Sequence, residues 1–190
     1  MQNARKGDII MADNLKLRRK QNNYGGEEFT IVNAKLLRKP FRNFEGRPTK
    51  IHPNGGIREF CVVIDDPEVA QELAAFGFNV KTLTNRDGAY DDDLHYLSIK
   101  VSYYDRYGEP VRYPPRFKIF TANNECYYEE QNIKELDGAE LSDVKIKFTA
   151  HYNKVGDKEY QTPYLNLFQA TMVDDFFFDD EEDDMPFDVD

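Results

Sequence analysis

Two segments of this sequence interleave positively charged and aromatic side chains, the first over residues 38–56 and the second over residues 104–116. Single-stranded nucleic acid needs both kinds, because cations track its phosphates and flat rings stack on unpaired bases at roughly 1–3 kcal/mol per base. We therefore expect a strand-binding surface that does not read sequence. The candidate nucleic-acid contacts are Arg38, Lys39, Phe41, Arg42, Phe44, Arg47 and Lys50 in the first segment, Tyr104, Arg106, Tyr107, Arg112, Tyr113 and Arg116 in the second, and Lys81, Lys100, Lys145 and Lys147 elsewhere.

The same two segments have a plainer interpretation. Aromatic loop residues often anchor a loop on the core while the neighbouring cations are only solvated, and any one of these rings could do so. Because the alternation of cations and rings occurs in two separate segments, the sequence favours binding over anchoring for the pair as a whole.

The last 17 residues, 174–190, form a second candidate site of a different kind. They hold ten acidic side chains and no basic one, so they account for the whole formal net charge of −10, and the preceding residues are neutral. Such a polyanion can compete with nucleic acid for a basic surface or dock on a basic partner. Phe needs a pocket, which favours a docking peptide over a merely solubilising tail. The expected partner-binding residues are Phe176, Phe177, Phe178, Met185, Pro186 and Phe187.

Catalytic arrangements are weak. Asp91, Asp92 and Asp93 with His95 could suggest a metal site, but adjacent carboxylates point in alternating directions and the surrounding residues indicate a surface turn. The three histidines lack partners at zinc-ligand spacing, and no phosphate-binding glycine motif is present. We expect no cofactor, no metal and no enzymatic activity, with a metal-dependent DNA-processing enzyme kept as an alternative.

The elements that must position these residues are mostly strands. Alternating or short apolar runs predict strands over residues 28–37, 57–64, 94–104, 117–121, 141–152 and 158–173, and residues 78–83 are expected to be extended. Asp66 followed by Pro67 predicts the start of a short helix that Gly77 ends. Both charged-aromatic segments are rich in Pro and Gly and are expected to be loops. About five or six strands with one short helix favour an all-β small barrel over a sandwich.

The domain organisation follows from composition. Residues 1–26 are polar and basic and are expected to form a flexible arm, residues 27–173 one β-barrel domain, and residues 174–190 a disordered acidic tail. The two cysteines are too few for a disulfide framework, and no stretch suits a signal peptide or a membrane span. We expect a soluble protein of the cytoplasm.

One stretch resembles a known family. The run Gly55–Lys81, GGIREFCVVIDDPEVAQELAAFGFNVK, places a strand ending in Asp before a helix and a Gly-Phe-Asn-Val-Lys turn. This is similar to the single-stranded DNA-binding proteins of tailed bacteriophages, and Leu141–Val173 resembles their closing hairpin. The resemblance implies an OB-fold that coats single strands and supports replication and recombination in the infected bacterial cell.

The tail is similar to the tip of bacterial single-stranded DNA-binding proteins in having Met185-Pro186-Phe187 after a run of acids. In those proteins the last Phe presents its own carboxylate, whereas here Asp188-Val189-Asp190 follow. The resemblance implies recruitment of replication or recombination proteins, read by a dedicated phage partner. We expect the tail to cover the DNA groove until DNA displaces it.

Three alternatives stay open at this stage. An acidic interaction protein or DNA mimic would not need the charged-aromatic loops, a nuclease would need the acids at 91–93, and RNA could replace DNA because stacking and phosphate contacts do not separate the two. Self-association of the chain stays open as well.

Overall fold

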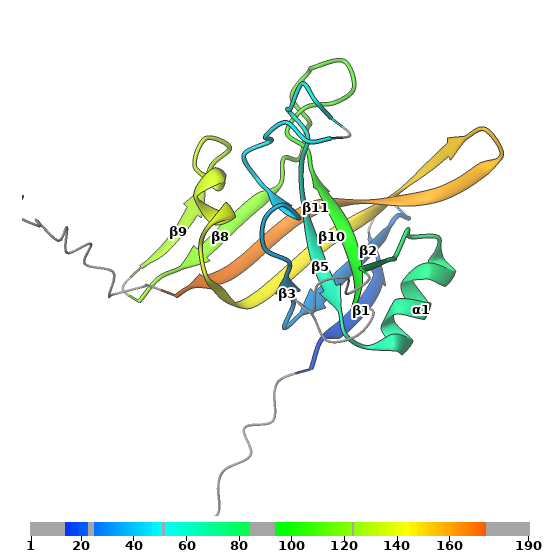
Figure 1. Ribbon diagram of the computed structural model, residues 1–190, viewed down its shortest axis with the longest axis horizontal. Coiled ribbons are helices and arrows are strands. Elements are labelled where there is room, and N and C mark those ends of the chain that lie inside the picture. The colour runs from blue at the N-terminus through cyan, green and yellow to red at the C-terminus, as the bar shows by residue number, and fades with distance from the viewer. Residues whose placement is uncertain (1–13, 23–24, 51, 84–93, 123, 174–190) are drawn as a thin grey trace, which may run out of the picture.

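The computed structural model describes residues 14–22, 25–50, 52–83, 94–122 and 124–173, and these form one sheet-rich body with a single α-helix (Figure 1). The acidic tail and most of the predicted N-terminal arm lie outside the described residues. The strands are β1 (Lys16–Gln21), β2 (Glu27–Val32), β3 (Lys35–Leu36), β4 (Arg42–Asn43), β5 (Arg58–Ile64), β6 (Lys81–Leu83), β7 (Leu94–Val101), β8 (Arg116–Phe120), β9 (Glu125–Tyr128), β10 (Leu141–Val155) and β11 (Lys158–Met172).

Five strand segments close a barrel. β2 and β3 act as one strand that is interrupted at Asn33, whose φ is 58°. β3 pairs antiparallel with β5, β5 with β7, β11 with β10, and β10 with β2, while β7 and β11 are parallel. The path thus returns to the strand where it began. This is a five-stranded Greek-key barrel of the OB type, which confirms the predicted fold class.

The remaining strands extend this barrel. β4 pairs with β5, β6 with β7, and the hairpin of β8 and β9 attaches to β11. A 3₁₀ helix, η1 (Ile133–Asp137), follows β9. The sequence patterns predict no strand or helix over residues 125–140, whereas the structure has β9 and η1 there.

The prediction that residues 1–26 form a flexible arm was also wrong in part. Lys16–Gln21 forms β1, which pairs antiparallel with β2 over its whole length. Leu15 is buried and Leu17 packs against the core, so apolar side chains hold one face of this strand. Burial of that face explains why a basic and polar segment is ordered here.

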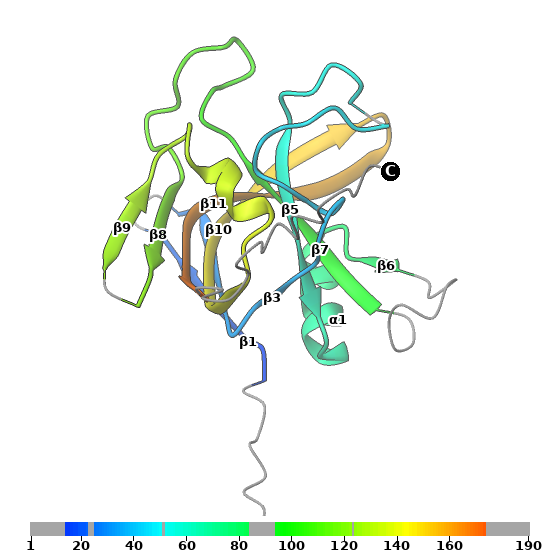
Figure 2. The ribbon, with the colours of Figure 1, turned by 60° about the vertical axis from the view of Figure 1, so that its left-hand side comes forward.

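The single helix, α1 (Pro67–Phe76), forms where the sequence predicted it. The Asp66 carboxylate accepts the backbone N–H of Glu68 at 2.9 Å, and Gly77 ends the helix in the left-handed conformation. Leu73 is fully buried, and Phe76 contacts Phe29 at a ring-centroid distance of 4.8 Å. The helix therefore covers the end of the barrel opposite the two long loops (Figure 2).

Phenylalanines fill the core of this chain, which has no Trp. The largest side chains with almost no exposed surface include six of them, and several meet edge to face, a favourable geometry for aromatic rings. No helix among the described residues has the length and apolar character to span a membrane. The six buried rings are Phe29, Phe44, Phe60, Phe117, Phe148 and Phe168.

Candidate nucleic-acid interface

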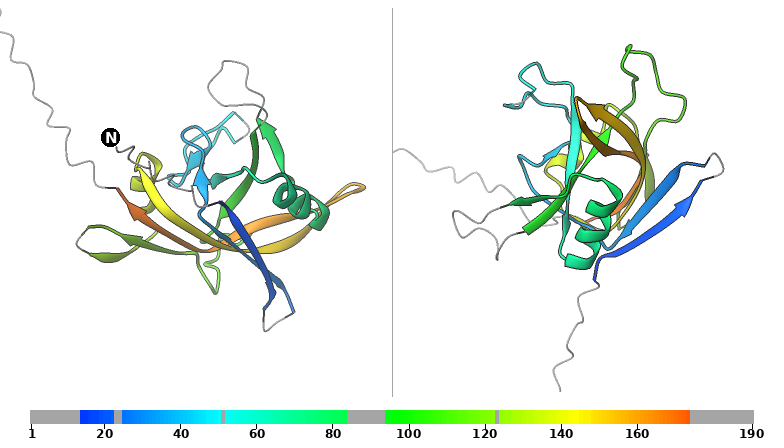
Figure 3. Two further views of the ribbon diagram at one scale, coloured as in Figure 1. Left: turned by 90° about the horizontal axis from the view of Figure 1, so that it is seen from below. Right: turned by 90° about the vertical axis from the view of Figure 1, so that its right-hand side faces the viewer.

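The two charged-aromatic segments stand at the same end of the barrel (Figure 2). The first loop, residues 37–57, connects β3 to β5 and includes β4, and the second loop, residues 102–115, connects β7 to β8. Because β5 and β7 pair antiparallel, Arg58 lies opposite Val101, so the end of the first loop and the start of the second are neighbours. Beyond this shared base the loops diverge (Figure 3).

Phe44 of the first loop does not face solvent. Its side chain has 0% exposed surface and lies edge to face against Phe117 and Phe168, at centroid distances of 5.5 and 5.6 Å. Its backbone N–H donates to a carboxylate oxygen of Asp137 at 2.7 Å. The prediction that Phe44 stacks on a base was wrong, because the ring is part of the core.

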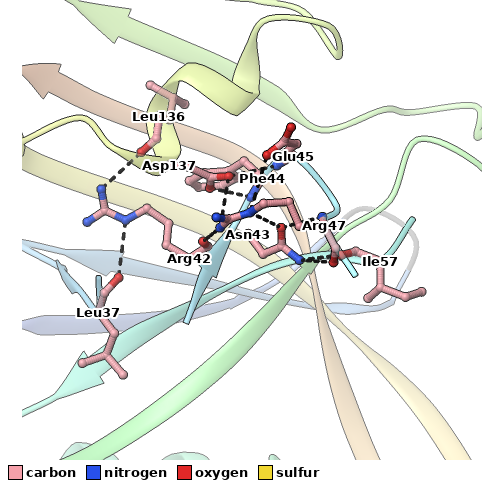
Figure 4. A network of polar contacts seen from close by, with 9 residues as sticks. All are labelled: Leu37, Arg42, Asn43, Phe44, Glu45, Arg47, Ile57, Leu136 and Asp137. Atoms are coloured by element: carbon pink, nitrogen blue, oxygen red, sulfur yellow. Dashed lines mark hydrogen bonds and ion pairs between the residues drawn. The ribbon is translucent and has the colours of Figure 1, made fainter. Parts of the chain in front are cut away.

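Arg42 is also used by the fold. Its side chain is only 7% exposed and donates to the carbonyl oxygens of Leu37 and Leu136 at 3.4 and 3.2 Å (Figure 4). It also donates to the carbonyl oxygen of Ala139 at 2.8 Å. Burial lowers the pKa of the Arg42 guanidinium, and the Asp137 carboxylate opposes that shift. Arg42 therefore ties the first loop to η1, and the prediction that it neutralises a phosphate was wrong.

Arg47 belongs to the same polar network. Its guanidinium donates to the carbonyl oxygen of Arg42 at 3.0 Å and lies 3.6 Å from a carboxylate oxygen of Asp137, which is buried (Figure 4). The Asn43 side chain accepts the Arg47 backbone N–H at 2.8 Å and donates to the carbonyl oxygens of Arg47 and Ile57 at 3.0 and 3.4 Å. Arg47 thus stabilises the loop, although its side chain remains partly accessible.

The other predicted residues of the first loop have mixed positions. Phe41 is half-buried against Tyr96, with ring centroids 5.7 Å apart, and helps cover the buried Cys61. Lys50 is exposed. Arg38 and Lys39 are exposed beside a groove of about 1070 Å³. The lining of this groove also holds Lys35 and Arg42 and three acids, Asp137, Glu140 and Asp143, so carboxylates offset most of its positive charge.

The second loop presents its rings to solvent. Tyr107 and Tyr113 are 73% and 70% exposed, and Tyr104 is 47% exposed. Arg106, Arg112 and Arg116 are exposed as well, although Arg116 is the first residue of β8. The predicted contacts of this loop are thus brought together on an accessible surface.

The second loop is held in shape by its own backbone. The Asp105 carboxylate accepts the backbone N–H groups of Tyr107 and Glu109 at 2.8 and 3.0 Å, as Asp often does in turns. Gly108 has a φ of 83°, a conformation that favours glycine. The Val111 N–H donates to the Tyr103 carbonyl oxygen at 2.9 Å, which closes the base of the loop.

Cations lie on the tyrosine rings of this loop. The guanidinium of Arg106 lies 4.7 Å from the centroid of the Tyr107 ring, and that of Arg112 lies 5.2 Å from the Tyr113 ring. Such contacts are worth about 0.5–1 kcal/mol at exposed sites. Each pair places a positive charge beside an accessible ring, the combination that single strands require.

Tyr104 connects the second loop to the body. Its hydroxyl donates to one carboxylate oxygen of Glu130 at 3.1 Å, while Arg58 donates to the other at 2.6 Å. The hydrogen bond to Glu130 raises the pKa of Tyr104. Arg58 also lies 5.6 Å from the ring centroid of Tyr103, whose pKa burial raises to about 12. The base of the loop is therefore fixed, while its rings at 107 and 113 stay accessible.

The predicted lysines outside the loops fall on two different surfaces. Lys81 on β6 is paired with Tyr96 of β7. Lys100 on β7 is paired with Glu59 of β5. Lys145 and Lys147 lie on β10, on the outer side of the strand, because Val144, Ile146 and Phe148 point into the core. The structure does not gather these four lysines into one track.

Sequence reasoning missed two aromatic groups. Tyr152 and Tyr160 are 58% and 37% exposed on the projecting end of the β10–β11 hairpin, where OB barrels often contact oligonucleotides. On the β8–β9 hairpin, Lys118 lies 5.0 Å from the Phe120 ring centroid and 6.0 Å from that of Tyr127. In the sequence, Tyr152 and Tyr160 could have been recognised because they flank the expected hairpin turn. No sequence pattern pointed to Phe120 and Tyr127.

The alternative of a metal-dependent enzyme finds no support in the described part of the chain. There, no three His, Cys, Asp or Glu side chains come together as metal ligands. Asp91, Asp92 and Asp93 lie outside the described residues, as do the six predicted partner-binding residues of the tail.

Most of the chain is similar to one known protein family. Residues 19–187 match a family model described as a phage ssDNA-binding domain. Among solved structures, gp2.5, a single-stranded DNA-binding protein encoded by bacteriophage T7, is similar at 11% sequence identity and a TM-score of 0.40, with 91% of this chain and 100% of that chain covered. No curated protein matches the chain.

Proposed function

Because this chain belongs to the phage ssDNA-binding family, we propose that it coats single-stranded DNA without reading its sequence. The observation that carries the proposal is the second loop, where Tyr107 and Tyr113 are exposed beside Arg106 and Arg112. The rings stack on unpaired bases, and the guanidinium groups neutralise the adjoining phosphates.

Additional contacts extend the path of the strand from this loop. Tyr104 and Arg116 stand at its two ends, and exposed Lys50 belongs to the first loop, while Arg38 and Lys39 beside the groove are further predicted contacts. Because none of these contacts reads a base edge, every base is accepted. Binding weakens with salt, since each neutralised phosphate releases condensed counterions.

The acidic tail regulates this surface in our proposal. Its ten acids give it the charge of a competing strand, so it covers the cations in the free protein and is displaced by DNA. The released tail then recruits replication or recombination proteins through Phe176, Phe177, Phe178, Met185, Pro186 and Phe187. The protein acts in the infected bacterial cell, where single strands are exposed during phage replication and recombination.

A pair of anisotropy titrations tests this proposal. Labelled oligo-dT is titrated with the full chain and with residues 1–173 at about 50 and 200 mM salt. We expect salt-sensitive binding by both proteins and tighter binding without the tail, most clearly at low salt where screening is weak. Equal affinity of the two proteins at low salt would refute the covering role of the tail. Absence of binding by both would refute strand coating and favour an acidic interaction protein.

A further inference from the structure

A second group of cations lies on the sheet surface that points away from the core. On β10, Ile146 and Phe148 are fully buried, so Lys145 and Lys147 between them face outward. On β8 the buried Phe117 and Ile119 likewise place Arg116 and Lys118 on the outer side. β1 follows the same rule, with Leu17 toward the core and Lys16 and Arg18 outward.

Strand register aligns these cations into two rows. Lys147 lies opposite Thr30, which lies opposite Arg18, and on its other side Lys147 lies opposite Leu167 and then Arg116. The second row is parallel to the first: Lys145 is followed by Val32 and Lys16 on one side, and by Gln169 and Lys118 on the other. We call the six side chains the cation grid, and its members are Lys16, Arg18, Arg116, Lys118, Lys145 and Lys147.

The dimensions of the grid follow from sheet geometry. Its cations occupy every second strand of five neighbours, β8, β11, β10, β2 and β1, which form one continuous layer (Figure 3). Strands are about 4.8 Å apart, so the cations of one row are separated by roughly 9.6 Å and the row spans roughly 19 Å. The two rows are about 6.7 Å apart, since residues two apart on a strand differ by two rises.

Most of the positive charge of the grid is not neutralised. Lys118 pairs with Glu125 at 2.9 Å, and Lys147 lies 3.7 Å from Glu28, which is shared with Lys20. Within the described parts of the chain, the other four members have no ion pair, namely Lys16, Arg18, Arg116 and Lys145.

The side chains between the cations differ from those of the second loop. Thr30, Val32, Leu167 and Gln169 fill the intervening positions, and none of them is a ring. Among the described residues, rings lie at the borders of the grid: Lys118 contacts Phe120 and Tyr127, and Tyr164 lies opposite Thr149, the next outward position of β10 after Lys147. A surface with cations and without central rings attracts phosphates and gains nothing from unpaired bases.

We propose that the cation grid is a second DNA-binding surface that holds a sugar-phosphate backbone whether the DNA is single- or double-stranded. This inference rests on the proposed function, because it takes DNA as the polyanion that the chain meets. The grid begins at Arg116, the residue that follows the second loop, and extends over the outer surface of the sheet. A second stretch of DNA bound there lies beside the strand bound at the second loop.

Charge-matched variants of the full chain test the grid. Arg18→Gln with Lys145→Gln removes two unpaired members, and Lys35→Gln with Lys134→Gln removes two exposed cations elsewhere. Each protein is titrated with a labelled blunt duplex and with labelled oligo-dT over a salt series. For the grid variant we expect weaker duplex binding and a log–log salt slope shallower by up to about 1.8, since each phosphate contact contributes about 0.9. The control variant keeps the slope of the unmodified chain.

The two proposals fail in different ways. Tyr107→Ala with Tyr113→Ala is expected to weaken oligo-dT binding and to leave duplex binding unchanged. Duplex binding that is absent in the unmodified chain, or that responds equally to the grid variant and the control, overturns the grid. A third outcome is that the tyrosine variant binds oligo-dT as tightly as the unmodified chain while the grid variant binds the duplex more weakly. This outcome overturns the role of the second loop and supports the grid.

Discussion

The two loops have the same sequence signature, but the structure buries a ring and a cation of the first and exposes those of the second. Both alternate cations with aromatic rings, yet Phe44 and Arg42 of the first loop are buried, while Tyr107 and Arg106 of the second are exposed. The difference is a buried acceptor, Asp137, which binds the backbone of the first loop from η1. Alternating cations and aromatic rings therefore indicate a binding surface only where the rings and cations stay exposed. In the first loop, a buried carboxylate binds the backbone and draws the loop onto the core.

The largest expected effect comes from breaking the first loop. Phe44→Ala leaves a cavity among Phe60, Phe117 and Phe168 and should cost about 3–5 kcal/mol of unfolding free energy. Urea unfolding followed by circular dichroism measures this loss. The matched variant Tyr107→Ala removes an exposed ring and should stay within about 0.5 kcal/mol of the unmodified chain. Equal losses in the two variants would remove the distinction between the loops.

The second prediction concerns affinity. Tyr107→Ala and Tyr113→Ala should each weaken oligo-dT binding by about 1–3 kcal/mol, which corresponds to about 5- to 150-fold, because each removes one stacking platform. Tyr107→Phe and Tyr113→Phe keep the rings and should bind nearly as well as the unmodified chain. Anisotropy titration at one salt concentration measures both sets, and a comparable loss in the Phe variants would argue against stacking.

The third prediction concerns the cations beside those rings. Arg106→Gln with Arg112→Gln should make the log–log salt slope for oligo-dT shallower by about 1.4, since a single-strand phosphate contact contributes about 0.7. The first-loop pair Arg38→Gln with Lys39→Gln, which faces the acids of the groove, should change the slope less. A larger change for the first-loop pair would transfer the main phosphate contacts to that loop.

The smallest expected effect is a change in the alkylation rate of Cys61, which depends on how the first loop packs over this thiol. Burial raises the pKa of the Cys61 thiol to about 11, so the thiol stays protonated at pH 8 and should react slowly with iodoacetamide. The reactive thiolate fraction increases with pH, and the rate should increase about tenfold per pH unit below pH 11. Phe41→Ala uncovers Cys61 and should accelerate alkylation at pH 8. An unchanged rate would mean that Phe41 does not shield this thiol.

Much of the barrel could be predicted from local patterns. Asp66, Pro67 and Gly77 specified the helix because capping is a local property, and the alternation Leu97, Ile99, Val101 specified β7. β1 was missed because Leu15 and Leu17 give only two apolar positions among cations, and pairing with β2 decides its conformation. Local composition also misjudged Arg42, whose partners Leu136 and Ala139 lie more than 90 residues away.

The cation grid was beyond sequence reasoning for a similar reason. Lys145 and Lys147 could be predicted to share a face, since they alternate with apolar residues. Their alignment with Arg18 on one side and Arg116 on the other depends on the register of five strands from three distant segments. Local alternation sets the face of a side chain, and tertiary pairing sets its neighbours.

Photocrosslinking tests the central claim, that single strands bind at the rings of the second loop, most directly. An oligonucleotide carrying 5-iododeoxyuridine is bound to the full chain, irradiated, and the crosslinked peptides are identified by mass spectrometry. We predict adducts at Tyr107 and Tyr113, reduced by unlabelled oligo-dT and not by a blunt duplex. Adducts confined to Tyr152 and Tyr160 of the β10–β11 hairpin, with none in the second loop, would contradict the account.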